Sequence, residues 1–184
     1  MQALATKGAT AAMALQAFMA KLKWTAGADF DLAAVFERAD SPVNAPTYGI
    51  VYFHEKGDIN KSPFVALDKD AGVGDKAGAN EETLRVQKLD GLRRLWLLCW
   101  DYGKVQKGEP ARFAQTDVQL DFVTVPDDGN RLGVKLAATT VGNVAVVAEL
   151  DNTNPISAKI TNLSKTGTLN GLKDLSDLVA IIKG

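Results

Sequence analysis

Acidic side chains are concentrated in two segments that lie well apart in the chain. The first is Gly27-Ala28-Asp29-Phe30-Asp31-Leu32, and the second runs from Asp68 to Glu82 with the sequence DKDAGVGDKAGANEE. Both combine carboxylates with glycine or small residues, where the backbone bends easily and exposes its carbonyl oxygens. If the fold brings the two together, either the pKa values of the carboxyl groups rise or a cation lies between them. Oxygen ligands of this kind suit a hard cation, and calcium before magnesium.

The candidate ligands are the oxygen-bearing side chains of these two segments. Asp29 and Asp31 are two residues apart at the start of a predicted strand, so both point to the same face. The candidates in the second segment are Asp68, Asp70, Asp75, Asn80, Glu81 and Glu82, of which at least one is expected to be a ligand. The alternative is that neither segment binds a metal: Asp29 and Asp31 would lie at a solvated strand end, and the second segment would be a flexible polar loop whose charge Lys69 and Lys76 neutralise in part.

Familiar calcium-loop and catalytic motifs are absent from the sequence. Counted from Asp70, position twelve is Glu81, but positions three and five are glycines, so the loop is not an EF-hand. His54 is the only histidine and Cys99 the only cysteine, and nothing nearby in the sequence orients either for catalysis. Cys99 lies in the apolar run 95–100 and is expected to be buried. Since nucleophile, phosphate-loop and dinucleotide motifs are also missing, we predict a non-enzymatic protein.

Many short apolar runs separated by turn residues predict an antiparallel β-sandwich with a short C-terminal helix, formed as a single domain over residues 1–184. The strands are expected at 30–36, 48–54, 64–67, 83–89, 94–102, 118–125, 132–136, 144–150 and 156–163. The run 94–102 is almost continuously apolar, which favours a central strand buried on both faces. Residues 9–23 fit a helix by alanine content and a strand by alternation. Residues 103–110 are expected to form a loop, and Pro126-Asp127-Asp128-Gly129 a hairpin turn.

The C-terminal segment has apolar residues at helical spacing. They are Leu172, Leu175, Leu178, Val179 and Ile182, with Asn170 as a candidate N-cap and Gly184 at the end. A helix of about three turns is marginal alone in water, so its apolar face must be buried. It can dock on its own sandwich, or on another copy or another protein, which would make the chain a homo-oligomer or a partner-binding protein.

Charge and hydropathy exclude several classes of partner. There are 21 Lys and Arg residues against 22 Asp and Glu, which gives a net charge of −1, so we expect no nucleic-acid partner. Arg93-Arg94 is interpreted as a solvated strand edge. No stretch approaches the roughly 20 apolar residues of a membrane-spanning helix, and the alanine-rich run 11–20 is a poor signal peptide. We therefore expect no membrane partner and a cytoplasmic protein.

The order of the motifs resembles the TerD family of tellurium-resistance and stress proteins. That family opens with a Leu-x-Lys-Gly stretch, which is similar to Leu4-Ala5-Thr6-Lys7-Gly8, and continues with a Gly-x-Asp-x-Asp-Leu-Asp motif, similar to 27–33. A strand, a Ser-Pro pair and a Gly- and Asp-rich loop follow, and the comparable residues are Val51-Tyr52-Phe53-His54, Ser62-Pro63 and 67–81. The resemblance covers about residues 4–150, and the extension 151–184 has no counterpart.

The resemblance implies a calcium-binding β-sandwich in which Asp68 and Glu81 match the family loop best. The chain departs from the pattern at Ala33 and Ala79, where the family has aspartate. The retained motif order favours a calcium-binding, non-enzymatic stress-response or tellurium-resistance protein. The lost acidic positions and the added helix favour the alternative, a structural or assembly protein of the particle or tail type that uses the same sandwich as a scaffold, with weak or no calcium binding.

Overall fold

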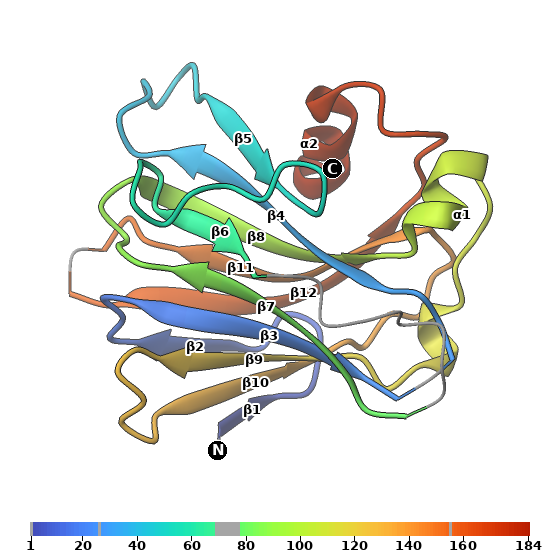
Figure 1. The fold of residues 1–184 in the computed structure, drawn as a ribbon, viewed down its shortest axis with the longest axis horizontal. Coiled ribbons are helices and arrows are strands. Elements are labelled where there is room, and N and C mark those ends of the chain that lie inside the picture. The colour runs from blue at the N-terminus through green and yellow to red at the C-terminus, as the bar shows by residue number, and fades with distance from the viewer. Residues whose placement is uncertain (1, 26, 69–77, 155) are drawn as a thin grey trace.

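Two six-stranded sheets pack face to face in the computed structural model, which describes residues 2–25, 27–68, 78–154 and 156–184 (Figure 1). Sheet A consists, in spatial order, of β1 (Gln2–Leu4), β10 (Arg131–Lys135), β9 (Gln119–Thr124), β3 (Phe18–Trp24), β7 (Asn80–Val86) and β6 (Val65–Leu67). Sheet B consists of β2 (Thr10–Met13), β12 (Ala158–Gly167), β11 (Val144–Asp151), β8 (Leu92–Trp100), β4 (Asp31–Arg38) and β5 (Tyr48–Val51). All neighbours are antiparallel except β1 and β10. The predicted antiparallel β-sandwich with a C-terminal helix is confirmed.

The segment that fitted both a helix and a strand forms two strands, β2 and β3. Along β3, Phe18, Ala20, Leu22 and Trp24 are buried while the residues between them are half-exposed. This period of two matches a sheet with one face toward the core. Pairing with β7 and β9 therefore overrides the helical preference of the alanine-rich sequence.

The near-continuous apolar run forms the central strand β8, as predicted. It lies between β11 and β4. Leu95, Leu97 and Cys99 belong to the core between the sheets, whereas Trp96, Leu98 and Trp100 belong to a second core on the outer face of sheet B. Because both faces are covered, neither needs polar residues.

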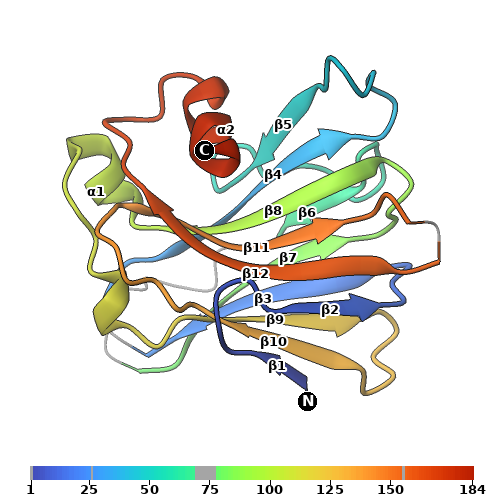
Figure 2. The same cartoon turned by 180° about the vertical axis from the view of Figure 1, so that it is seen from behind.

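The C-terminal helix α2 (Leu175–Lys183) covers the outer face of sheet B, as both ribbon views show (Figures 1 and 2). Its residues Leu178 and Ile182 are buried there, and the Lys183 ammonium lies 4.9 Å from the centre of the Trp96 ring. The expected N-cap was wrong. Asp174 caps the helix by accepting a hydrogen bond from the Ser176 amide at 2.8 Å, because the helix begins five residues after Asn170.

The loop expected at 103–110 instead contains a short helix, α1 (Tyr102–Lys107). Only Val105 of this helix is buried, so the sequence carries no apolar period to reveal it. Its ends are fixed by capping. The Asp101 side chain accepts from the Lys104 amide, and Gly108 ends the helix at a φ of 65°, a value that glycine adopts without strain.

Arg93 and Arg94 do not lie at a solvated strand edge, because their strand β8 is central in sheet B. Arg93 Nη1 donates to Oε1 of the buried Glu37 at 2.8 Å. Arg94 lies 3.6 Å from a carboxylate oxygen of Glu149 and equally far from one of Asp151. Both arginines thus balance carboxylates on the neighbouring strands.

Within the described residues, no helix is both long and apolar enough to span a membrane.

Candidate functional site

Four strand ends bring the described residues of the two acidic segments to one end of the sandwich. In sheet A, Trp24 at the end of β3 pairs with Asn80 at the start of β7. In sheet B, Asp31 at the start of β4 pairs with Trp100 at the end of β8. The β3–β4 connection and α1 lie at this same end in both ribbon views (Figures 1 and 2). We call this end of the sandwich the acidic end.

Glu82 connects the two segments directly. Its carboxylate Oε2 accepts a hydrogen bond from the backbone amide of Leu32 at 2.5 Å, and the residue is only 8% exposed. Glu82 was one of the candidate ligands in the second acidic segment. The alternation of Glu82 with the apolar Leu84 and Val86 was the sequence signal for its burial, because it places all three side chains on the inner face of sheet A.

Three carboxylates at the acidic end raise the pKa of one buried thiol. Burial raises the pKa of Cys99 well above its ordinary value, and the negative charges of Asp31, Glu82 and Asp101 raise it further. The three carboxylates come from three different strand ends, and each lies close enough to Cys99 to affect the pKa of its thiol. Since the thiol stays protonated at neutral pH, Cys99 is poorly suited to act as a nucleophile.

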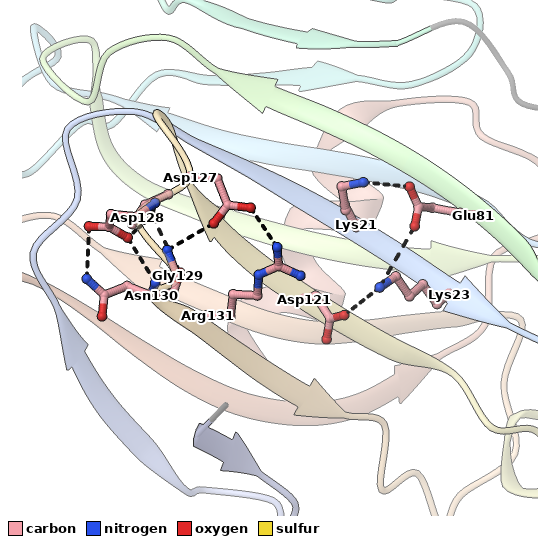
Figure 3. A network of polar contacts seen from close by, with 10 residues as sticks. Lys21, Lys23, Glu81, Asp121, Asp127, Asp128, Gly129, Asn130 and Arg131 are labelled. Atoms are coloured by element: carbon pink, nitrogen blue, oxygen red, sulfur yellow. Dashed lines mark hydrogen bonds and ion pairs between the residues drawn. The ribbon is translucent and has the colours of Figure 1, made fainter.

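The two best family matches, Asp68 and Glu81, are held by basic side chains on sheet A. Both carboxylate oxygens of Asp68 lie 2.9 Å from Arg85 Nε. Glu81 lies 2.8 Å from Lys21 Nζ and 3.9 Å from Lys23 Nζ, and Lys23 also reaches Asp121 at 2.8 Å (Figure 3). The charges of Asp68 and Glu81 are thus balanced without a metal ion.

The remaining predicted ligands are divided among different surroundings. Asp29 lines a cleft of about 640 Å³ beside α1, whereas Asn80 and Glu81 line a separate cleft of about 610 Å³ that also includes Lys23 and Arg131. Asp70 and Asp75 lie outside the described residues. Within the parts of the chain that the structure describes, no three His, Cys, Asp or Glu side chains are grouped as metal ligands.

The only histidine lies in an aromatic cluster. The strand predicted to run to His54 ends at Val51, because Tyr52 and Glu55 exchange backbone hydrogen bonds across a tight turn. The exposed His54 ring lies 4.1 Å from the Phe53 ring and 6.0 Å from the Tyr102 ring, centre to centre. These contacts account for the residue as part of a packed surface cluster.

Comparison with known proteins finds no matching family model, no matching curated protein and no matching solved structure. The likeness to the TerD family therefore rests on the motifs of the sequence.

Proposed function

We propose that this chain is a TerD-like, non-enzymatic protein that binds calcium at the acidic end of its sandwich and acts in a cytoplasmic stress or tellurium-resistance response. The observation that carries the proposal is the bond from the Leu32 amide to Glu82. It joins the two acidic segments at the point where the resemblance implies a shared calcium site. A cation there would offset the mutual repulsion of the neighbouring carboxylates.

The proposed ligands are carboxylates of the two acidic segments. Asp29 precedes β4 and Asp31 is its first residue, and the resemblance adds Asp70 and Asp75 of the second acidic segment. Glu82 is proposed as a positioning residue, because its hydrogen bond fixes the start of β4. All-oxygen ligands of this kind suit calcium, and the bound ion would supply a fixed positive charge at this end.

Asp68 and Glu81 are weaker candidates in this arrangement. To bind calcium, Asp68 would have to leave Arg85, and Glu81 would have to leave Lys21. Each exchange would leave a cationic side chain without its partner and thus lower the net gain in free energy. Asn80 is retained as a neutral oxygen ligand beside them.

Calorimetric titration of calcium into the full chain tests the proposal. We expect binding, together with a rise in melting temperature that grows with calcium concentration, because the ion binds only the folded state. The Asp31→Asn variant should lose both effects while keeping its fold by circular dichroism. The Asp90→Asn variant, at an exposed position outside both acidic segments, is the matched control and should keep calcium binding.

The ion pairs of Asp68 and Glu81 favour a second candidate function. Because basic side chains already balance these two best-matching positions, the sandwich can serve as a structural or assembly scaffold of the particle or tail type without a metal. Absence of calcium binding at millimolar concentration, with no shift in melting temperature, would reject the first function and favour this one.

A further inference from the structure

The connection that leads from β3 to β4 is held at its start by one carboxylate. Asp117 lies shortly before β9, and it accepts two hydrogen bonds from Thr25, the first residue after β3. The Thr25 amide donates at 2.9 Å and the Thr25 hydroxyl at 2.5 Å. Hydrogen bonds to a carboxylate are stronger than those between neutral groups. We call this pair of residues the Thr25–Asp117 brace.

The braced residue also contacts the second acidic segment. The carbonyl oxygen of Thr25 accepts a hydrogen bond from the Gly78 amide at 3.2 Å. Gly78 belongs to the segment that ends at Glu82, so this bond joins the β3–β4 connection to the second acidic segment. It is a second junction, in addition to the bond from the Leu32 amide to Glu82. Thr25 is therefore hydrogen-bonded to Asp117 through its amide and hydroxyl and to the second acidic segment through its carbonyl.

The later part of the connection is fixed by two aromatic residues. The indole Nε1 of Trp24 donates to the carbonyl oxygen of Ala28 at 2.9 Å. Phe30 is only 2% exposed, and its ring stacks on the Phe113 ring of the short 3₁₀ helix η1 (Phe113–Gln115) with 5.5 Å between the ring centres. The proposed ligands on either side of Phe30 are thus carried by a backbone that is held at several points. Ordering of this kind before a ligand arrives lowers the entropic cost of binding.

We propose that the Thr25–Asp117 brace positions the β3–β4 connection for calcium, and thus holds Asp29 and Asp31 beside the second acidic segment before the ion binds. Neither residue of the brace is a proposed ligand. The inference rests on the proposed calcium function and assigns positioning residues to its site. Groups that orient metal ligands from outside the coordination shell commonly change the metal affinity about tenfold or more.

The Thr25→Val variant tests the brace without changing any charge. It loses the hydroxyl bond but leaves the Asp117 carboxylate in place, so a change in calcium affinity reports position rather than electrostatic attraction. We expect calorimetric titration of calcium into the full chain to show an affinity about tenfold lower than that of the parent. Thr25→Ser keeps the hydroxyl and should restore an affinity close to that of the parent.

Thr153 offers a matched control at the opposite end of the sandwich. Its amide and its hydroxyl both donate to Asp151 Oδ1, at 2.9 and 2.6 Å, and the residue is exposed, as Thr25 is. Asp151 pairs with Arg94 near the start of β8, whereas the acidic end lies at the end of that strand. Thr153→Val should therefore leave the calcium affinity unchanged. An equal loss of affinity in both valine variants would be a general effect on the fold and would overturn the inference.

A measurement without calcium tests the positioning itself. Hydrogen exchange of the Gly78 amide, followed by NMR in the calcium-free chain, should be faster in Thr25→Val, because the carbonyl that accepts from this amide is less firmly held. Thr153→Val should not change it. Unchanged exchange in Thr25→Val would mean that the brace does not hold the two segments together, and the inference would be rejected.

The outcomes separate this inference from the function on which it rests. If the parent chain binds calcium and Thr25→Val binds it equally tightly, the inference is wrong and the calcium function stands. If the parent chain does not bind calcium, the proposed function fails and the inference fails with it. Lower affinity and faster Gly78 exchange in Thr25→Val, both absent from Thr25→Ser and Thr153→Val, support the inference.

Discussion

Asn162 connects the two sheets through a single buried side chain. From β12 in sheet B, its Nδ2 donates to the carbonyl oxygens of Leu4 in β1 and Lys135 in β10, at 2.8 and 2.9 Å. Its Oδ1 accepts from the Ser164 hydroxyl at 2.6 Å, and that hydroxyl accepts from the Ala137 amide. All polar atoms of the Asn162 amide group are thus used where the residue is fully buried, which is the condition under which a buried polar network stabilises a fold.

The Asn162→Ala substitution should lower the free energy of unfolding by about 3 kcal/mol, because buried carbonyl oxygens lose their donors and a small cavity forms. Urea denaturation followed by circular dichroism measures this change. The matched control is Asn44→Ala at an exposed loop position, for which we expect a change within about 0.5 kcal/mol. Equal stability of the two variants would show that the Asn162 network contributes nothing measurable.

At the scale of the element, the β9–β10 hairpin depends on the polar residues of its turn. Asp128 accepts from the Thr124 hydroxyl and from the backbone amide and side chain of Asn130, and Asp127 accepts from the Gly129 amide and from Arg131 (Figure 3). The predicted turn therefore forms, and its register is set by hydrogen bonds to ionised carboxylates. The hydrogen bond from Thr124, followed by those from Asn130, lowers the pKa of Asp128 below its usual range.

A lowered carboxyl pKa in the folded state makes the hairpin sensitive to acid. The stabilisation is present above the pKa of the unfolded chain and is lost as the pH falls through the lower folded pKa. The Asp128→Asn variant should therefore melt at a lower temperature than the parent chain near neutral pH, and the gap should shrink below about pH 4. Thermal melts followed by circular dichroism across this range give the comparison, with Asp90→Asn at an exposed position as the control. A gap that is constant with pH would exclude this contribution of the Asp128 charge.

At the scale of the whole molecule, the outer faces of the two sheets differ. The described outer face of sheet A carries charged side chains in ion pairs, such as Glu81 with Lys21. The outer face of sheet B is apolar around Trp96 and Leu98, and α2 covers it. Of the two docking modes open to the C-terminal helix, the one present within this chain is packing on its own sandwich. This arrangement buries an apolar face that would otherwise favour association.

Because α2 docks on its own chain, weakening this contact should lower the stability of the fold without changing the molecular mass in solution. Leu178 of α2 is fully buried against the outer face of sheet B, so Leu178→Ala should cost about 2–5 kcal/mol in the free energy of unfolding. The control is Ala180→Ser on the exposed side of the same helix. Light scattering on both variants tests the alternative, because a drop from oligomer to monomer in Leu178→Ala would mean that the helix joins separate copies.

The sequence by itself determined the fold class, the central strand β8 and the existence of an amphipathic C-terminal helix. These features follow from local periodicity, because burial of one or both faces must repeat every two or 3.6 residues. Helix α1 escaped prediction because capping by Asp101 and Gly108, rather than an apolar period, defines it. Only the tertiary structure decided which group each carboxylate contacts. The sequence could not assign Asp68 to Arg85, Glu81 to Lys21 or Glu82 to the Leu32 amide, because such pairings depend on strand register and on the face to which each side chain points, and a shift of one residue reverses that face.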